Sequence, residues 1–310
     1  MARRFTFIGV TTGTSSIMRI FPRWRDALGL GADVEIIGWD LPLRARPDQY
    51  RATVESLRDD PTNLGALVTT HKIDLYRAAH DLFDDVDAYA RLCDEVSCIA
   101  KRDGRLLGWA KDPVSAGQTL DGLLGPRYFG RTGGETLLLG AGGAGVAITL
   151  HLLTRDDAAD RPARVVVVDR DAARLASLRA LHDRLDTTVT VEYVHNADPL
   201  VADARVAALP PGSLVINATG LGKDRPGSPL SDAARFPTEG IVWELNYRGA
   251  LTFRRQALAQ QAARGLRVED GWQYFIYGWT AVIAEVFDRV ITPGEPQLLA
   301  RVAAFARPRG

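Results

Sequence analysis

A glycine-rich turn between two apolar runs constrains the fold of this 310-residue chain more than any other feature. The run 136–139 predicts a strand, and the run 146–153 predicts a helix. Between them lie the six residues Gly140, Ala141, Gly142, Gly143, Ala144 and Gly145. A Gly-x-Gly-x-x-Gly sequence in this position permits a tight turn and lets backbone amides approach a pyrophosphate at the helix N-terminus. We therefore predict that these six residues bind a dinucleotide, with a turn that binds nothing as the alternative.

The next predicted strand, over 165–168, bears on the choice of dinucleotide. It ends at Asp169, whose carboxylate can accept hydrogen bonds from the adenosine ribose and would repel a 2′-phosphate. This acidic residue favours NAD. Arg170 follows and can face a phosphate instead, so NADP stays open. An aspartate at position 169 can also cap the helix expected from Ala172 onward.

Composition argues against several other classes of protein. The formal net charge is zero, and aromatic residues are not interleaved with a basic patch, which argues against nucleic-acid binding. The apolar runs are shorter than the roughly 20 residues of a membrane helix. The histidines are scattered, so we predict no metal site. Cys93 and Cys98 are the only cysteines, which suggests buried thiols in a reducing compartment and hence a cytoplasmic protein.

Short apolar runs alternate with helical patterns along the chain, and this alternation predicts an α/β fold. A chain of this length should form two α/β domains. Before the glycine-rich turn we expect strands over 5–10, 34–39, 64–69, 97–102 and 106–109, and helices over 20–28, 50–58, 74–79 and 115–124. Residues 11–16 should continue the first strand, and 97–102 should pair with 106–109. After the turn we expect strands over 165–168, 189–194, 214–217 and 241–245, and helices over 175–185, 253–264, 271–290 and 297–305.

Several segments resemble, in their order and spacing, the shikimate dehydrogenase superfamily, and the resemblance covers nearly the whole chain. The glycine-rich turn matches that family's Gly-Ala-Gly-Gly-Ala signature. Residues 217–222 resemble its Asn-Ala-Thr-x-x-Gly segment, and residues 244–252 resemble its Asp-x-x-Tyr-x-Pro-x-x-Thr stretch, with Glu244 in place of Asp. Asp270 and Gly271 open a buried helix as they do in the family. The resemblance implies that the following residues lie beside the cofactor: Asn217, Ala218, Thr219, Gly222, Leu245 and Gly271.

Two further matches concern the proton chemistry of this family. Residues 70–72 resemble the end of its motif Asn-Val-Thr-x-Pro-His-Lys, whose lysine is catalytic, and residues 108–112 resemble Gly-x-Asn-Thr-Asp, whose aspartate is the partner. Hydride transfer to a ketone leaves an oxygen that must be protonated, and alcohol oxidation needs the reverse. The resemblance therefore implies that Lys72 and Asp112 form a catalytic pair. The alternative is an exposed lysine at a helix start and an aspartate cap before Pro113.

The substrate side departs from the family pattern. The family's Ser-x-Ser pair becomes Ser15 and Ile17, unless a shift of the loop brings other hydroxyls into use. Elsewhere smaller or less polar residues replace family residues: Ala66, Ser97 and Ala110 stand for asparagines, Thr70 for proline and Gly278 for glutamine. Trp109, Trp272, Tyr274 and Trp279 either line the freed space or pack in the core, and for at least half of them we expect core packing. The predicted substrate-binding residues are Thr14, Ser15, Ser16, Thr70, Ser97 and Tyr247.

These features together predict an NAD(P)-dependent oxidoreductase that interconverts a hydroxyl and a ketone on a cyclic, shikimate- or quinate-like and modified substrate. By the resemblance, residues 1–113 with the C-terminal helices 270–310 form a substrate-binding domain, and residues 114–269 form a Rossmann-type domain for NAD or NADP. A cleft is expected between the two. The loss of polar partners keeps a second interpretation open, a catalytically weak or inactive dinucleotide or metabolite sensor. We expect a monomer or homodimer that binds neither nucleic acid nor a membrane.

Overall fold

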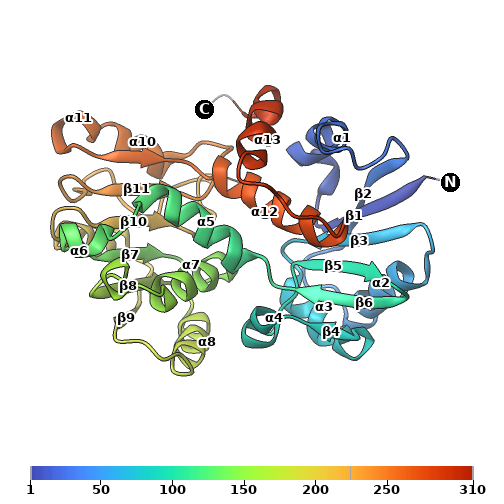
Figure 1. The fold of residues 1–310 in the computed structure, drawn as a ribbon. Coiled ribbons are helices and arrows are strands. Elements are labelled where there is room, and N and C mark those ends of the chain that lie inside the picture. Colours follow the sequence, from blue (N-terminus) through green and yellow to red (C-terminus); the bar gives the residue numbers. More distant parts are fainter. Residues whose placement is uncertain (1, 224, 309–310) are drawn as a thin grey trace. The chain divides into compact units, whose positions relative to one another are not determined.

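Two sheets, each of six strands, organise the computed structural model of the chain, which describes residues 2–223 and 225–308. Each sheet belongs to its own unit. Unit 1 holds Met1–Asp112 and Ile276–Arg307, and unit 2 holds chiefly Pro113–Phe275. Both units combine strands with helices, so the predicted α/β class is confirmed (Figure 1). Within the described part of the chain, no helix has the length and apolar character needed to pass through a bilayer.

The elements of unit 1 follow the chain in an alternating order. They are β1 (Arg3–Gly9), the 3-10 helix η1 (Thr12–Thr14), α1 (Ser16–Leu28), β2 (Val34–Asp40), α2 (Pro47–Asp59), β3 (Asn63–Val68), α3 (Lys72–Ala79), β4 (Asp85–Val86), α4 (Ala88–Cys93), β5 (Cys98–Arg102) and β6 (Arg105–Trp109). The C-terminal part of α12 (Trp272–Val286) and α13 (Glu295–Ala303) complete the unit.

The sheet of unit 1 has the order β2-β1-β3-β5-β6-β4. Strand β1 pairs in parallel with β2 and β3, whereas β5 runs antiparallel to both β3 and β6. The carboxyl ends of β3 and β6 therefore lie at the same sheet edge as the start of β5. This topology brings together residues 69–72, 94–97 and 110–112, which are distant from one another in the sequence.

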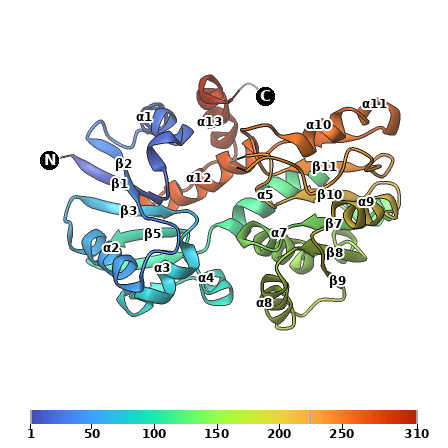
Figure 2. The same ribbon diagram turned by 180° about the vertical axis from the view of Figure 1, so that it is seen from behind.

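Alternating side chains of β1 pack against helices on both faces of this sheet. On one face Phe5 lies against Phe21 of α1, at 5.3 Å between ring centroids, and against Trp279 of α12 at 6.0 Å. On the other face Ile8 belongs to a buried cluster that includes Val54 of α2 and residues of α3. Figure 2 shows α2 and α3 packed side by side on that face. The period of two in the strand is what gives the sheet its two apolar faces.

Unit 2 alternates strands and helices more regularly. Its elements are α5 (Asp112–Leu124), α6 (Tyr128–Thr132), β7 (Thr136–Leu139), α7 (Gly143–Thr154), β8 (Arg164–Asp169), α8 (Ala172–His182), β9 (Thr190–His195), α9 (Pro199–Ala207), β10 (Leu214–Asn217), β11 (Ile241–Glu244), α10 (Thr252–Leu258), α11 (Gln261–Arg264) and β12 (Arg267–Glu269). The first residue of α5 is assigned to unit 1, and α12 begins in unit 2 and continues into unit 1.

All six strands of this second sheet are parallel, in the order β12-β11-β10-β7-β8-β9. The order reverses between β7 and β10, the two central strands. In open α/β sheets, ligands bind beyond the carboxyl ends of the strands at the point of this reversal. The glycine-rich turn follows β7, and residues 218–222 follow β10, so both segments lie at this point. Unit 2 thus has the strand order of the Rossmann dinucleotide-binding fold.

Helices cover both faces of the parallel sheet, since its strands are apolar on both sides. Figure 1 shows α5 and α7 over one face, where Leu138 and Ile148 belong to one buried cluster. The opposite cluster contains Leu137 of β7 with Val206 of α9 and Phe253 of α10. Strand β7, which leads into the glycine-rich turn, is therefore packed into the core of unit 2 on both of its faces.

Several sequence-based elements differ from the structure. Residues 11–16 do not continue the first strand, because a 3-10 turn forms over Thr12–Thr14 and α1 begins at Ser16. The single helix expected over 253–264 is divided into α10 and α11, and α12 ends at Val286 instead of continuing to residue 290. The elements β4, α4, α6, α9 and β12 were not predicted. Most of these are too short to show a hydrophobic period. The expected hairpin of β5 and β6 is present.

Candidate functional site

The predicted catalytic pair lies at the sheet edge of unit 1 where β3 and β6 end. Lys72 is the first residue of α3, and its Nζ donates a hydrogen bond to Oδ2 of Asp112, the first residue of α5. The two side chains are 18% and 19% exposed. The alternative of an exposed lysine at a helix start is therefore wrong. An ammonium and a carboxylate in contact, both largely buried, form a group that can donate and accept a proton.

The charges around Lys72 determine which form this group takes. Burial lowers the pKa of Lys72, but the negative charges of Asp112 and Glu95 raise it, and the net change is upward. Lys72 is consequently an ammonium at neutral pH. It can donate a hydrogen bond or a proton to an oxygen atom, whereas Asp112 supplies the acceptor.

A strained turn precedes Lys72. The backbone N–H of His71 donates to the carbonyl of Thr69 at 2.5 Å, and Thr70 between them has a φ of 58°. A β-branched residue in the left-handed region is unfavourable, and such strain is concentrated at functional sites. Proline, the residue of the family motif at this position, has a fixed negative φ and does not fit this turn. Thr70 itself is exposed, as a residue that contacts substrate must be.

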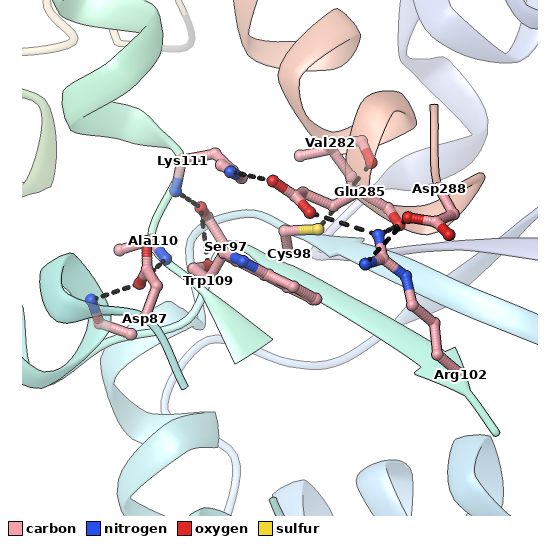
Figure 3. A network of polar contacts seen from close by, with 11 residues as sticks. Asp87, Ser97, Cys98, Arg102, Trp109, Ala110, Lys111, Val282, Glu285 and Asp288 are labelled. Atoms are coloured by element: carbon pink, nitrogen blue, oxygen red, sulfur yellow. Dashed lines mark hydrogen bonds and ion pairs between the residues drawn. The ribbon is translucent and has the colours of Figure 1, made fainter. Parts of the chain in front are cut away.

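A network of polar contacts holds the segment that leads to Asp112 (Figure 3). The backbone N–H of Lys111 donates to Oγ of Ser97 at 2.7 Å, and its Nζ pairs with Glu285 of α12. Arg102 also pairs with Glu285, at 3.3 Å. Both cations lie over the ring of Trp109, at 5.4 Å for Arg102 and 5.8 Å for Lys111. The position of Asp112 is thus set from β5, β6 and α12.

This network also accounts for Ser97, one of the predicted substrate-binding residues. Its side chain is buried, its Oγ accepts the N–H of Lys111, and its hydroxyl points to the carbonyl of Trp109 at 3.5 Å. The hydroxyl therefore serves the local backbone. Sequence reasoning had not identified Lys111 or Glu285, because a surface ion pair and one that fixes a site look the same in a sequence.

Glu95 is a third residue that sequence reasoning missed. It lies between α4 and β5, is only 5% exposed, and its backbone N–H donates to Ala90 at 3.3 Å. Burial raises the pKa of Glu95 to about 7, with Lys72 lowering it and Asp112 raising it further. An acidic residue directly before the apolar run 96–100 was the available signal.

The hydroxyl-rich segment near the N-terminus lies at the start of α1. Ser15 and Ser16 are half-buried there, and Thr14 is exposed and donates its hydroxyl to the carbonyl of Thr11 at 3.0 Å. Ile17, at the position of the second family serine, is fully buried in the core. Thr14, Ser15 and Ser16, the three predicted substrate-binding residues of this segment, are therefore all at least partly accessible.

In unit 2 the glycine-rich turn has the geometry that the motif requires. Gly140 has a φ of 113°, and a Cβ placed there would lie 2.8 Å from the backbone carbon of Ala218. A Cβ on Gly145 would lie 2.4 Å from the carbonyl oxygen of Gly140. At Gly142, by contrast, the nearest atom to such a Cβ is Nη1 of Arg174 at 3.9 Å. The turn is tightly packed at its two ends and open in the middle, at the N-terminus of α7.

Asp169 ends β8, as predicted, and its carboxylate accepts hydrogen bonds from backbone N–H groups. It is 9% exposed, and its two oxygens accept the N–H of Ala141 at 2.6 Å and of Asp171 at 2.8 Å. Asp171 and not Asp169 caps α8, so the expected cap role of Asp169 is wrong. Arg170, directly after β8, and Arg174, in α8, are both exposed, and Nη1 of Arg174 lies beside Gly142 of the glycine-rich turn.

Buried amides shape the second loop of unit 2, over residues 217–222. Asn217 is fully buried, donates to Glu244 at 2.8 Å and accepts the N–H of Thr219 at 3.1 Å. Asn246 donates to the other oxygen of Glu244 through both its backbone and its side chain, at 2.9 and 2.7 Å. Burial raises the pKa of Glu244 to about 7, against these hydrogen bonds. The loop that packs on Gly140 therefore rests on an internal polar network.

The remaining predicted residues lie where β11 leads toward α12. A Cβ on Gly271 would lie 1.8 Å from the carbonyl of Leu245, so only glycine fits there. The ring of Tyr247 packs on Trp272 at 5.4 Å and on Phe275 at 4.9 Å. Tyr247 is half-buried, so part of its surface stays accessible.

The other aromatic candidates are buried or packed against the core. Trp279 is 5% exposed and packs on Phe7 of β1 at 5.1 Å. Tyr274 packs on the buried Trp243 at 5.7 Å. The expectation of core packing for at least half of the four aromatic residues is confirmed by these two and by the buried Trp272.

Comparisons with known proteins agree with this architecture. No protein-family model matches the chain. A shikimate dehydrogenase (NADP(+)) from Symbiobacterium thermophilum is 33% identical over 233 residues, which is 74% of this chain and 72% of the relative. The structure of shikimate 5-dehydrogenase from Thermus thermophilus in complex with shikimate is 25% identical, covers 98% of both chains and has a TM-score of 0.69. The ligand-free 5-ketofructose reductase of Gluconobacter sp. strain CHM43, at 20% identity and over 98% of this chain and 99% of that one, shares the fold with a TM-score of 0.67.

Proposed function

The chain belongs to the shikimate dehydrogenase family, and we propose that it transfers a hydride between a nicotinamide dinucleotide and a hydroxyl-bearing carbon of a cyclic substrate. The contact between Lys72 and Asp112 carries this proposal. A dinucleotide held by the glycine-rich turn would supply or take up the hydride. The chain's own residues then have to bind the substrate oxygen and move its proton.

The proton chemistry follows from the charges of the pair. In alcohol oxidation, Lys72 donates a hydrogen bond to the hydroxyl oxygen, and the carboxylate of Asp112 accepts the hydroxyl proton as the hydride leaves carbon. In ketone reduction the same path runs in reverse: the protonated carboxyl group of Asp112 returns the proton to the carbonyl oxygen, while the ammonium of Lys72 donates a hydrogen bond to that oxygen. The raised pKa of Lys72 keeps it cationic in both directions. A catalytically silent sensor would not need this pair.

For the cofactor we favour NADP over the NAD expected from the sequence. NAD selection needs a carboxylate that is free to accept ribose hydroxyls, but both oxygens of Asp169 already accept backbone N–H groups. NADP selection needs cations for the 2′-phosphate, and Arg170 and Arg174 supply two. The relative from Symbiobacterium is also named for NADP. A fluorescence titration gives the Kd for each dinucleotide, and Arg174→Ala should weaken NADP binding and leave NAD binding unchanged.

For the substrate we propose a cyclic hydroxy or keto compound that is less polar at one edge than shikimate. Ile17 is fully buried, and Ala66 and Gly278 stand where the family has polar side chains. A site that has lost polar partners does not retain specificity for the same polar groups. The accessible hydroxyls of Thr14, Ser15 and Ser16 would hold the polar edge that remains. The fold itself does not choose the substrate, since a protein of the same fold is a 5-ketofructose reductase.

The proposed function is tested by following the absorbance of reduced dinucleotide. The purified protein is supplied with NADP or NAD and a panel of cyclic alcohols that includes shikimate and less polar analogues. Lys72→Ala and Asp112→Asn should each abolish the turnover of any active compound. Lys101→Ala is the matched control, because Lys101 is another partly buried lysine of unit 1 but donates to the carbonyl of Asp60 at 2.6 Å. Undiminished turnover in Lys72→Ala would refute the mechanism, and efficient turnover of shikimate with none of the analogues would refute the substrate proposal.

A further inference from the structure

We infer that Glu95 is a positioning residue that acts through Lys72, and that one ammonium and two carboxyl groups together form the proton-handling site. This inference rests on the proposed function of Lys72 and Asp112. It adds a residue that lies outside the two segments, 70–72 and 108–112, that carry the pair.

The topology of unit 1 brings Glu95 to Lys72. Strand β5 begins at the sheet edge where β3 and β6 end, and Glu95 lies just before β5. The N–H of Val96 donates to the carbonyl of Lys72 at 3.4 Å, and the N–H of Ser97 donates to the carbonyl of Trp109 at 2.9 Å. The segment that carries Glu95 is therefore bonded on one side to the start of α3 and on the other to the strand that leads to Asp112.

The charged groups around Glu95 divide into two sets. The charges of Lys72 and Asp112 both shift the pKa of Glu95. Glu95 in turn raises the pKa of Lys72, to which Cys93 makes a weaker contribution. Other charged residues nearby form ion pairs elsewhere. Asp94 pairs with Arg77, and Lys111 pairs with Glu285. Glu95 itself is 5% exposed. The electrostatic environment of this carboxyl group is thus that of the catalytic pair.

One ammonium cannot balance two carboxylates in a site with little water. Like charges at close range disfavour each other, so one of the two carboxyl groups keeps its proton. Asp112 accepts the hydrogen bond of the Lys72 ammonium, and Glu95 is the carboxyl group that is buried from solvent. Glu95 is therefore the group that holds the proton. The upward shift of its pKa to about 7 agrees with this assignment.

The proton on Glu95 sets the charge of the whole site. With Glu95 protonated, Lys72 and Asp112 balance and the site is neutral. With Glu95 ionised, the site carries one net negative charge and takes up a further proton, at Asp112, more readily. The neutral form favours release of a proton to a ketone oxygen, and the negative form favours uptake of a proton from an alcohol. The direction of turnover then responds to pH close to neutrality.

A titration of the ligand-free protein tests the assignment without any turnover. Infrared difference spectra report the carbonyl band of a protonated carboxyl group, and subtraction of Glu95→Gln from the wild type isolates the band of Glu95. This subtraction is needed because Glu244 also has a pKa of about 7. We expect a midpoint near 7. Asp112→Asn should lower this midpoint by about one pH unit or more, because it removes the like charge, and Lys72→Met should raise it by a similar amount.

Matched variants separate the outcomes of this titration. Glu244→Gln should remove a different band and leave that of Glu95 in place, and Glu55→Gln, at an exposed glutamate of α2, should change nothing. If Glu95→Gln does not fold, the opposite shifts in Asp112→Asn and Lys72→Met still identify the band. The inference would be overturned if the carboxyl group of Glu95 is ionised at pH 5. It would also be overturned if the midpoint of its band is the same in Asp112→Asn and Lys72→Met as in the wild type.

A pH profile then tests whether Glu95 matters to turnover. With an alcohol that the wild type oxidises, kcat should rise through a step close to neutral pH, and Glu95→Gln should lose that step while KM changes little. A profile identical to that of the wild type would refute the role in catalysis. If the wild type oxidises no alcohol, the proposed function fails, and the infrared titration still decides whether the three groups share protons.

Discussion

Each unit of the molecule buries a glutamate beside its predicted site, Glu95 in unit 1 and Glu244 in unit 2, and burial raises the pKa of both to about 7. The neighbours differ. Glu95 faces an ammonium and another carboxylate, whereas Glu244 accepts hydrogen bonds from the amides of Asn217 and Asn246. Burial therefore raises the pKa of both glutamates, but the neighbouring groups determine what each glutamate does. Glu244 supports the shape of a loop, and Glu95 can change the charge of a reacting site.

The same contrast holds for the two predicted sites as wholes. Unit 2 keeps the glycine-rich turn, the parallel strand order and the buried amides that support the second loop. Unit 1 keeps the contact of Lys72 with Asp112 but has apolar or small residues where the family has polar ones, such as Ile17. A site for a common cofactor requires one geometry, whereas a substrate site can change with its substrate.

The largest effect is expected from Lys72→Ala, which removes the ammonium of unit 1 and leaves the dinucleotide loop of unit 2 untouched. We expect kcat/KM to fall by roughly 10²–10⁴-fold, the usual share of a general acid or base. The Kd of the dinucleotide should keep its wild-type value. Initial rates and a fluorescence titration measure the two quantities. A parallel loss of dinucleotide binding would contradict the division of roles between the units.

Gly140→Ala should produce the opposite pattern, because it damages unit 2. The added methyl group meets the backbone of Ala218 at 2.8 Å, and the φ of 113° is unfavourable for alanine. We expect a loss of roughly 2–4 kcal/mol in the free energy of unfolding, together with weaker dinucleotide binding. Chemical denaturation measures the first.

Gly142→Ala is the matched control in the same turn. The nearest atom to its added methyl group is 3.9 Å away, so the free energy of unfolding should hardly change. Dinucleotide binding should still weaken, since the methyl group occupies the open side of the turn. Equal destabilisation by the two alanines would show that the turn is not packed as described.

Glu244→Gln should change how stability depends on pH. The folded protein keeps this carboxyl group protonated up to about pH 7, whereas the unfolded chain loses the proton near the ordinary value of 4.5. The contribution to stability is therefore fully present below pH 4.5 and is lost as the pH rises to 7. It amounts to roughly 3 kcal/mol. Urea denaturation at pH 5 and pH 8 should show this loss in the wild type and a smaller loss in the variant.

The exposed Glu55 provides the control for this measurement. Glu55→Gln should keep the full pH dependence of the wild type. If Glu244→Gln retained it as well, the amide network and not burial would dominate the ionisation of Glu244.

The smallest effect is expected at the strained turn before Lys72. Thr70→Gly should raise the free energy of unfolding by up to about 1 kcal/mol, because glycine adopts the φ of 58° without a steric penalty. The midpoint of thermal unfolding measures this gain. Thr70→Ala removes the same hydroxyl but keeps a Cβ, so it should gain less. Equal values for the two variants would mean that the turn stores no backbone strain.

The sequence predicted those elements whose signal is local. The bounds of β7 and β10 agree with the predicted 136–139 and 214–217, and the pairing of β5 with β6 follows from the turn between them. The division of 253–264 into α10 and α11 was missed, because no proline or glycine marks the break after Leu258. Lys72 and Asp112 were named through a family motif, and the contact between them is present. Their catalytic role stays a prediction.

Residues whose importance depends on distant neighbours were missed or misjudged. In the sequence, Glu95 has no feature that distinguishes it from other acidic residues. Only the sheet order of unit 1 brings it near Lys72. Asp169 was expected to face a ribose, which stays a prediction; its oxygens also accept the N–H groups of Ala141 and Asp171, which the sequence did not indicate. The preference for NAD was based on that expectation, and these two contacts are the reason why we now favour NADP.

The amino-acid sequence by itself determined the α/β class, the glycine-rich turn and the identity of the two residues proposed to handle protons. These properties depend on side-chain periods, on the backbone freedom of glycine and on motifs within a few residues. The tertiary structure decided which carboxyl groups lie near the ammonium of Lys72 and which backbone N–H groups the oxygens of Asp169 accept. Burial and the distance between charges determine both properties, and neither is defined until strands far apart in the sequence lie side by side in one sheet.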